Sequence, residues 1–230
     1  MYEIVAAVID NIPGTNVVTT VLEHPSSFDS SETFAKINGK ELRVAPSNMA
    51  TGGCDTDAII ELVDKDTCLL NVMYASNISG AIMNIPEIVR KARAKKPDLY
   101  ITVDAVQHAP HAIMDFSELD IDGVNFAPYK FFGVRGFGAA WVSDRLARLP
   151  HAKLIAKPEN FWGLGSDAPA QYAMVSKIVD YVCDLSDKKT GTRRELFETG
   201  MNKIVLQERA LLHVLPVSYT HLTLPTILLV

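Results

Sequence analysis

Short apolar runs rich in β-branched residues alternate along the chain with longer segments in which apolar residues recur every three or four positions. The first pattern is typical of buried strands, and the second of helices with one apolar face. We expect helices at residues 1–12, 27–37, 55–63, 85–95, 116–119, 145–149, 169–185 and 193–214, and strands at 17–22, 41–45, 67–72, 100–103, 123–126 and 138–142. This alternation predicts an α/β fold whose mostly parallel strands are joined by helical crossovers.

Two of the expected strands deliver a polar side chain at their carboxyl ends. The run 100–103 is followed by Asp104, with Gln107 just beyond it, and the run 123–126 leads into a loop that carries Lys130. Ligands of open α/β sheets bind beyond the carboxyl ends of the strands. A carboxylate and an amine at two such ends can therefore face one ligand.

Pyridoxal phosphate is a ligand that uses these two groups. A lysine amine forms a Schiff base with its aldehyde, and a carboxylate pairs with its protonated pyridine nitrogen and keeps the ring an electron sink. Gln107 can hydrogen-bond the phenolic oxygen from the same loop as Asp104. Plainer interpretations stay open, because a strand-end Asp often caps the next helix and most lysines are solvated.

Composition limits the class of protein. The chain has 230 residues, of which 48% are apolar, so it can build a sizeable core as one large domain or two small ones. Its net charge of −5 comes from acids and bases mixed along the chain, without the basic stripe of a nucleic-acid-binding protein. No apolar run reaches the length of a membrane span, and the first residues lack the basic start of a signal peptide.

The cysteines and histidines show no metal-site spacing. Cys54, Cys68 and Cys183 are far apart, which predicts neither a disulfide framework nor a zinc site and fits a reducing cytoplasm. Cys183 lies within a helical pattern and is expected to be a buried thiol. His108 and His111 flank a proline, but no cysteine or carboxylate completes a ligand set, so we expect no metal.

The segments VDAVQHAPH and DIDGVNFAPYKFFGVRGFGAAWV together resemble the core of the class V aminotransferase family, which includes cysteine desulfurases and selenocysteine lyases. That family carries a strand ending in Asp, a Gln three residues later, and a Lys in a following loop before a glycine-rich stretch. Asp104, Gln107 and Lys130 match this order. Two further segments, LEHPS at 22–26 and SNISG at 76–80, are similar to family motifs upstream.

The resemblance implies the fold and the domains. It implies a three-layer αβα fold, with the mostly parallel sheet of the large domain of fold-type I pyridoxal-phosphate transferases. Residues 1–150 would be this cofactor-binding domain without its N-terminal part, and residues 151–216 a connector with helices that lead to an absent C-terminal small domain. Residues 217–230 resemble a translated sequencing adapter and are expected to be a non-native tail.

The resemblance also implies roles for residues. Lys130 would be the catalytic Schiff-base lysine, Asp104 would hold the pyridine nitrogen, and Gln107 and Asn77 would contact the phenolic oxygen. Asn77 is equally explained as a turn residue before a glycine. Tyr129 stands where the family often has His, and it could stack on the cofactor or donate a hydrogen bond to it.

Other matches are partial. Ala127 replaces a Ser that would donate to the cofactor phosphate, whereas Gly165 and Ser166 are expected to reach the phosphate of a neighbouring subunit. His24 follows a strand and is expected to be a structural loop residue, because the ring-stacking residue of the family is expected in an earlier segment that the chain lacks.

The resulting functional prediction is a cytoplasmic, pyridoxal-phosphate-dependent enzyme that removes sulfur or selenium from a cysteine-type amino acid. Its substrate would be a small amino acid, without nucleic-acid or membrane partners, and the full-length protein would be a homodimer. Two alternatives stay open at this point. One is transamination or epimerisation of another amino acid on the same scaffold, and the other is an inactive truncated fragment.

Overall fold

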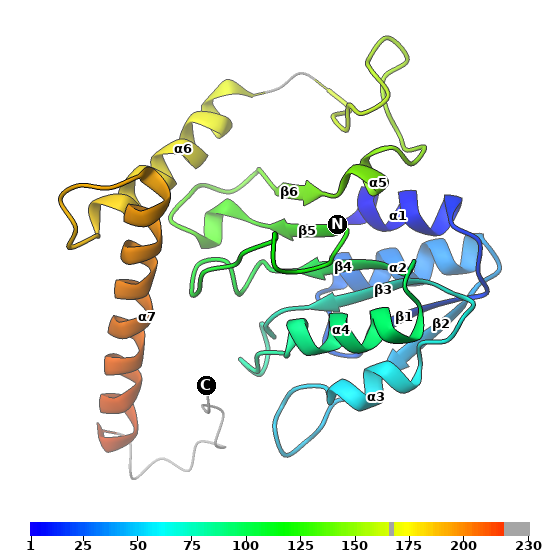
Figure 1. Cartoon of the computed structure of the whole chain (residues 1–230), viewed down its shortest axis with the longest axis horizontal. Helices are drawn as coiled ribbons and strands as arrows, with labels where there is room; N and C mark the ends of the chain where they lie inside the picture. The colour runs from blue at the N-terminus through cyan, green and yellow to red at the C-terminus, as the bar shows by residue number, and fades with distance from the viewer. Residues whose placement is uncertain (166–167, 219–230) are drawn as a thin grey trace.

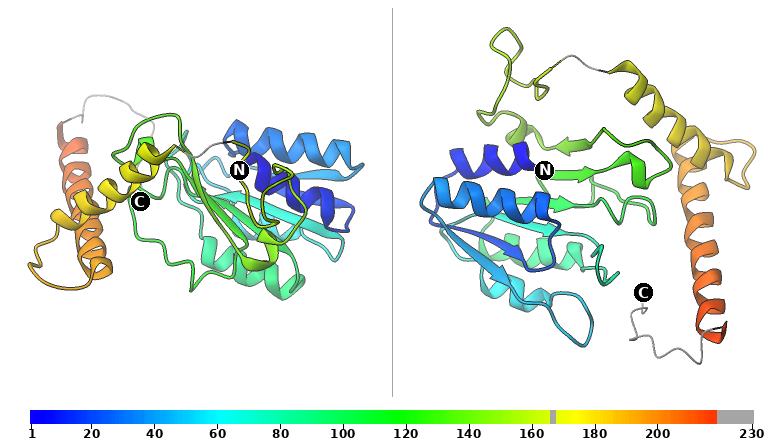
Figure 2. Two further views of the ribbon diagram at one scale, coloured as in Figure 1. Left: turned by 90° about the horizontal axis from the view of Figure 1, so that it is seen from above. Right: turned by 180° about the vertical axis from the view of Figure 1, so that it is seen from behind.

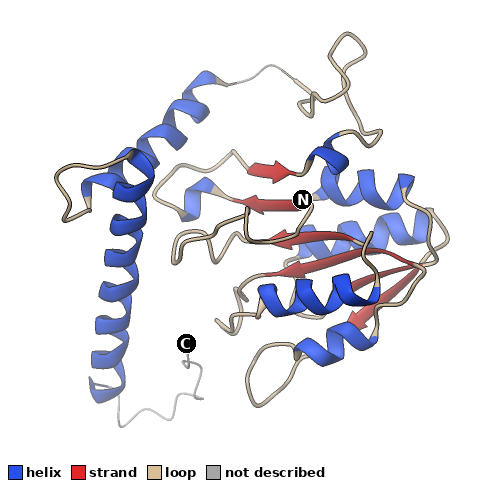
Figure 3. Ribbon diagram, in the orientation of Figure 1, coloured by secondary structure: helices blue, strands red, loops and turns tan. Residues whose placement is uncertain are grey.

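The computed structural model describes residues 1–165 and 168–218. At its centre is one six-stranded sheet in the order β2-β1-β3-β4-β5-β6 (Figures 1 and 3). The strands are β1 (Asn16–Thr20), β2 (Glu41–Ala45), β3 (Thr67–Met73), β4 (Tyr100–Asp104), β5 (Gly123–Phe126) and β6 (Ala139–Val142). The first five are parallel, and β6 runs antiparallel to β5.

Helices cover both faces of the sheet. On one face lie α1 (Tyr2–Asn11), α2 (Pro25–Ile37) and α5 (Asp144–Ala147), and on the other lie α3 (Thr56–Glu61) and α4 (Ile85–Lys95). Figure 2 shows α1 and α2 on one side of the sheet and α4 on the opposite side. Every residue of β1, β3 and β4 is buried, as expected of parallel strands covered on both faces. The predicted three-layer αβα fold is confirmed.

The order of the strands reverses around β1. Its successor β2 pairs on one side, and the next strand, β3, pairs on the other side. The gap between β1 and β3 is therefore a topological switch point, where the connections leave in opposite directions and a crevice opens beyond the strand ends.

Two further helices, α6 (Pro169–Asp184) and α7 (Arg193–Ser218), form a pair beside the sheet. In Figure 1, α7 stands across the end toward which β3, β4 and β5 point. A Cβ on Gly200 would lie 1.9 Å from the carbonyl oxygen of Val182, so the two backbones touch at this glycine. Phe131, from the loop after β5, packs with Val182 and Met201 in one apolar cluster.

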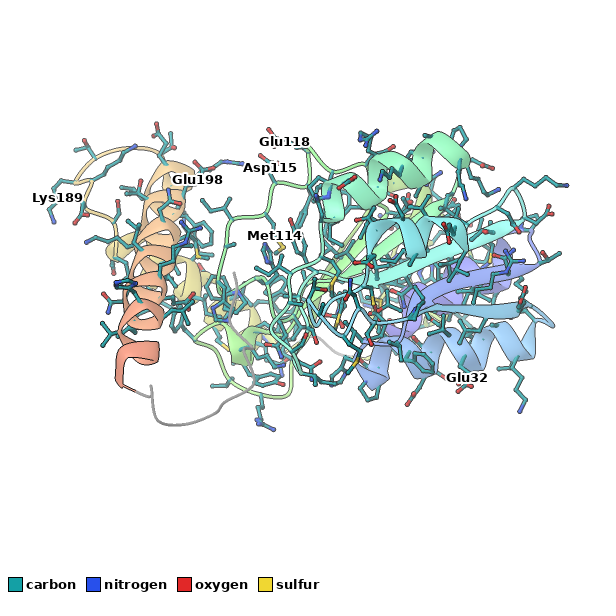
Figure 4. All side chains as sticks on the ribbon, turned by 90° about the horizontal axis from the view of Figure 1, so that it is seen from below. Glu32, Met114, Asp115, Glu118, Lys189 and Glu198 are labelled. Carbon is teal, nitrogen blue, oxygen red and sulfur yellow. The ribbon has the colours of Figure 1, made fainter. Side chains whose placement is uncertain are left out.

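Ion pairs also join α7 to the segment between β4 and β5. Arg194 donates to Asp115 at 2.6 Å and to Glu198 on its own helix at 2.7 Å, and His111 lies 2.7 Å from Glu208. Figure 4 shows Asp115 on this segment and Glu198 on the helix that it faces. These contacts bring α7 against the connection that follows Asp104.

Two predictions about local structure are wrong. Residues 116–119 form turns instead of a helix, because Asp115 accepts hydrogen bonds from the backbone N–H and hydroxyl of Ser117 and so stabilises a turn in place of a helical backbone. Cys183 is half-buried, not buried. Cys183 follows Val182 on α6 and lies at the edge of the contact between α6 and α7. Its Sγ is 3.4 Å from the carbonyl oxygen of Arg193.

Candidate cofactor site

A cavity of about 650 Å³ opens beyond the carboxyl ends of β1, β3, β4 and β5. Five of the residues predicted for the cofactor line it, although they come from separate parts of the chain: Asn77, Asp104, Gln107, Tyr129 and Lys130. The strand ends meet here because the strands are parallel and neighbouring. The structure thus brings the carboxylate and the amine that the sequence singled out to one cavity.

Asp104 is the last residue of β4 and is 4% exposed. Its Oδ1 accepts a hydrogen bond from the backbone N–H of Val106 at 3.0 Å. Burial raises the pKa of the Asp104 carboxyl, while the Val106 N–H and the positive charges of His24, the Met1 amine and Lys130 act in the opposite direction. A buried carboxylate of this kind gains free energy from a cationic donor presented by a ligand.

Lys130 ends a short 3₁₀ turn, Pro128–Lys130, which follows β5 directly. No carboxylate forms a salt bridge with it in the part of the chain that the structure describes. Its loop is packed tightly, because a Cβ on Gly133 would lie 2.7 Å from the carbonyl oxygen of Pro128 and 2.9 Å from Met174 of α6. The loop therefore carries an unpaired amine on a backbone held by its neighbours.

Asn77 and Tyr129 lie toward the exposed part of the cavity wall. Asn77 is exposed in a turn where Ser76 Oγ accepts from the N–H of Ser79 and Gly80 has a φ of +75°. It is thus both a turn residue and a cavity residue. The ring of Tyr129 lies under two cations, with Arg135 Cζ 4.9 Å and Lys130 Nζ 5.8 Å from the ring centroid.

Of the two residues predicted to reach a phosphate, the structure describes only Gly165. Gly165 does not line the cavity, and Ser166 lies outside the described residues. Trp162 lines the wall instead; it stacks on His151 with ring centroids 3.9 Å apart, and its Nε1 is buried without a hydrogen-bond partner within the described chain. The phosphate contact of Gly165 and Ser166 stays a prediction.

Among the cavity residues that sequence reasoning did not predict are His24 and Asn125. His24 does have the expected structural role, because its Nδ1 accepts from the N–H of Ser26 at 3.2 Å and caps α2, but its ring also lines the cavity. Asn125 of β5 lines the cavity too, and its Oδ1 is buried without a partner in the described part of the chain. Both residues could have been identified from the sequence, because each lies near the carboxyl end of a predicted parallel strand, where ligands bind.

The two histidines weighed as a metal pair make other contacts. His108 is buried and stacks on Tyr74 with ring centroids 3.7 Å apart, and burial lowers its pKa to about 4. His111 pairs with Glu208. Within residues 1–165 and 168–218, no three His, Cys, Asp or Glu side chains gather as metal ligands, and no helix is long and apolar enough to cross a membrane.

The side chains that line the cavity fit the ring end of pyridoxal phosphate. Asp104 offers a buried acceptor for a protonated ring nitrogen, Asn125 Oδ1 is an acceptor without a partner, and Lys130 offers an amine for the aldehyde. Among the described residues that line the cavity, only Lys130 and His24 have basic side chains, and Lys130 is already assigned to the aldehyde. The described residues therefore fit the ring and the aldehyde of pyridoxal phosphate rather than its phosphate.

Known proteins resemble this chain in sequence and in fold. The family model Aminotransferase class-V matches residues 3–157. A cysteine desulfurase IscS of Dictyoglomus turgidum is 31% identical over 129 residues, which cover 56% of this chain and 32% of that protein. A cysteine desulfurase of Yersinia pestis is 34% identical over 133 residues, which cover 58% of this chain and 32% of that protein. The chain spans about a third of the length of the curated relatives it matches.

Two solved structures share the fold. The crystal structure of the cysteine desulfurase CsdA from Escherichia coli superposes with a TM-score of 0.74 at 18% identity, covering 96% of this chain and 57% of that one. The apo cysteine desulfurase from Thermococcus onnurineus superposes with a TM-score of 0.72 at 20% identity, covering 93% and 53%. Because the family match extends over residues 3–157, which include Asp104 and Lys130, the chain belongs to the class V aminotransferase family.

Proposed function

We propose that the protein containing this chain is a pyridoxal-phosphate-dependent enzyme of the cysteine desulfurase type, which removes sulfur or selenium from a cysteine-type amino acid. One observation carries the proposal: Asp104 and Lys130, from the ends of neighbouring strands, line one cavity. The substrate class is supported by the relatives named above, which are cysteine desulfurases. The proposal extends to a homodimer of the full-length protein in a reducing cytoplasm, where free thiols such as Cys54 and Cys68 persist.

When bound, pyridoxal phosphate supplies an electron sink for negative charge that develops at the substrate α-carbon. Asp104 would hold the ring nitrogen in its protonated form, because a buried carboxylate stabilises a proton on its partner. Lys130 would bind the aldehyde carbon covalently and then move the proton at the substrate α-carbon. Asn77 and Gln107 would hydrogen-bond the phenolic oxygen, and Tyr129 would cover the ring at the exposed side.

The Schiff-base site is tested by visible absorbance after pyridoxal phosphate is added, followed by borohydride reduction. We expect a reducible band in the wild type and no such band in Lys130→Ala. Lys65→Ala is the matched control, because the Lys65 side chain is 90% exposed and lies at the opposite end of the sheet, before β3. A band that survives Lys130→Ala would remove Lys130 from its role, and no band in the wild type would favour the inactive fragment.

The reaction type is tested with cysteine as substrate. A desulfurase converts cysteine to alanine and passes the sulfur to an acceptor thiol as persulfide sulfur, which an added thiol reductant such as dithiothreitol releases as sulfide. A transaminase instead converts the amino acid to a keto acid. In the presence of dithiothreitol we expect sulfide and alanine in equal amounts from the full-length protein. Keto-acid formation without sulfide would contradict the desulfurase assignment and leave the cofactor site intact.

A further inference from the structure

Glu23, which the proposed mechanism does not use, lies in the turn that follows β1 and is 7% exposed. Its Oε1 accepts two hydrogen bonds of 2.8 Å, one from the hydroxyl of Thr20 and one from the backbone N–H of Met73. Met73 is the last residue of β3 and is the register partner of Asp104 on β4. One carboxyl oxygen therefore joins the end of β1 to the strand pair that carries Asp104.

This contact lies where the backbone ladder between β1 and β3 stops. The register runs from Asn16 opposite Thr67 to Val18 opposite Leu70. Beyond that point, side chains make the hydrogen bonds that link the two strands. Thr19 Oγ1 donates to the carbonyl of Asn71 at 2.9 Å, and Glu23 accepts from the N–H of Met73. The strands separate at the switch point, and without Glu23 the buried N–H of Met73 would lose this acceptor.

The second carboxyl oxygen of Glu23, Oε2, is buried and has no hydrogen-bond partner within the described residues. Burying an oxygen without a hydrogen-bond partner costs less free energy when it belongs to a neutral carboxyl than when it belongs to a carboxylate anion. The pKa of Glu23 is raised to about 8, because burial, together with the smaller effect of the negative charge of Asp104, outweighs the opposing effects of Thr20, Met73 and Ser27. Cys54 is a further titratable group nearby, and burial raises the pKa of its thiol as well.

His24 follows Glu23 directly and lines the cavity from the same turn. The position of its ring depends on how the chain is held on both sides of it. Before His24, Glu23 accepts from the Met73 N–H of β3, and after it Ser27, at the start of α2, accepts from Asn71 of the same strand. We propose that Glu23 is a positioning residue of the cofactor site, which holds His24 at the cavity wall and, as a neutral carboxyl, leaves the negative charge of the strand ends on Asp104. This inference rests on the proposed function.

Three variants separate the parts of this proposal. Glu23→Gln keeps an oxygen acceptor and is neutral, Glu23→Ala removes the acceptor, and Glu32→Ala is a matched control from the exposed side of α2, where Figure 4 labels Glu32. For pyridoxal phosphate binding we expect Glu23→Gln and Glu32→Ala to stay within twofold of the wild type. We expect Glu23→Ala to weaken binding about tenfold, and to shift the pH midpoint of the absorbance band, because the His24 ring and the Asp104 charge move relative to the cofactor.

Two measurements need no cofactor and so separate this proposal from the proposed function. Hydrogen exchange at the Met73 amide should be slow in the wild type and in Glu23→Gln and fast in Glu23→Ala. Carbon-13 NMR should show the Glu23 carboxyl protonated at pH 6.5. Fast exchange in Glu23→Gln, or a Glu23 carboxyl that ionises near pH 4.5, would overturn the proposal even if pyridoxal phosphate binds.

The cofactor measurements can overturn it independently. If Glu23→Ala lowers the melting temperature but leaves the affinity and the pH midpoint of the band unchanged, Glu23 is only structural. If Glu23→Ala does not fold, Glu23→Gln decides, because weakened binding in that folded variant would show that a neutral acceptor is not sufficient. Failure of the proposed function has a different signature, which is the absence of a Lys130-dependent band in the wild type.

Discussion

Asp104 of β4 lies opposite Asn125 of β5 in the parallel ladder, and both side chains line the same cavity. Burial raises the pKa of Asp104, and the Oδ1 of Asn125 has no hydrogen-bond partner among the residues described. Two neighbouring acceptors in one wall are a costly arrangement for an empty cavity. The two acceptors become favourable when a ligand presents a cationic donor, as the proposed cofactor would. In that case the cavity wall gains affinity for the ligand at a cost in the stability of the ligand-free protein.

The first prediction concerns Asp104→Asn. The raised pKa of Asp104 in the folded state means that its ionisation opposes folding, so wild-type stability falls as the pH rises through the range in which the unfolded carboxyl ionises. The Asn variant lacks this loss, and we expect its melting temperature without cofactor to exceed that of the wild type at pH 7. We expect pyridoxal phosphate affinity to fall by about ten- to a hundredfold, the value of one charged hydrogen bond. Equal affinities would contradict the role of Asp104.

The second prediction concerns the pH dependence of stability and Glu23. Its pKa is about 8 in the folded state, which exceeds the value of an unfolded glutamate. The folded protein then binds more protons than the unfolded chain between roughly pH 4.5 and 8, so stability decreases as the pH rises through that range. Urea unfolding at pH 5, 6.5 and 8 should show this slope in the wild type and a smaller slope in Glu23→Gln. Identical slopes would mean that Glu23 is ionised in the folded protein.

The third prediction concerns Gly133→Ala in the lysine loop. The new Cβ would lie 2.7 Å from a backbone carbonyl, that of Pro128, so the loop has to move. We expect a loss of about 1–3 kcal/mol in the free energy of unfolding, as for other overpacked sites, together with a weaker Lys130-dependent band. Gly53→Ala is the control, because the nearest atom to its Cβ position is the Cβ of Ala81 at 3.4 Å, an ordinary contact distance, and Gly53 does not line the cavity. A Gly133→Ala protein with unchanged stability and spectrum would contradict the tight packing of this loop.

The fourth prediction concerns the buried carboxylate of Asp122, at the opposite end of β4 and β5 from the cavity. Arg145 donates to it at 2.6 Å, Arg93 at 3.2 Å and the N–H of Ile101 at 3.0 Å. Burial opposes ionisation, but Arg145, the Ile101 N–H and Ser143 hold the pKa of the Asp122 carboxyl below its usual value. The stabilising effect of the carboxylate is therefore lost as the pH falls through that lowered pKa.

We expect Asp122→Ala to lower the free energy of unfolding by about 3 kcal/mol, because two arginines lose their buried partner. Urea unfolding at pH 7 measures the effect. Asp120→Ala serves as control, since the Asp120 side chain is 77% exposed and its pair with Arg93 is worth less than about 1 kcal/mol. Losses of similar size in the two variants would contradict the buried network.

Local sequence patterns are sufficient to locate most of the helices and strands and the polar residues at their ends. Apolar period and β-branched content are local properties, so the strand 100–104 and the helix 85–95 could be located from a few residues each. The same holds for Asp104 and Lys130, because a polar residue that ends an apolar run marks the ligand side of a parallel sheet. The turn at 116–119 was mispredicted because one side chain, Asp115, competes with the helical backbone.

Which strand ends become neighbours depends on packing between segments that are distant in the chain. The reversal of strand order at β1 and β3 and the antiparallel β6 depend on contacts far apart in the chain. That packing puts His24 and Asn125 in the cavity wall and buries Glu23 under it. The charge state of a carboxyl is set by what surrounds it in space, because desolvation and nearby charges act through distance and not through sequence.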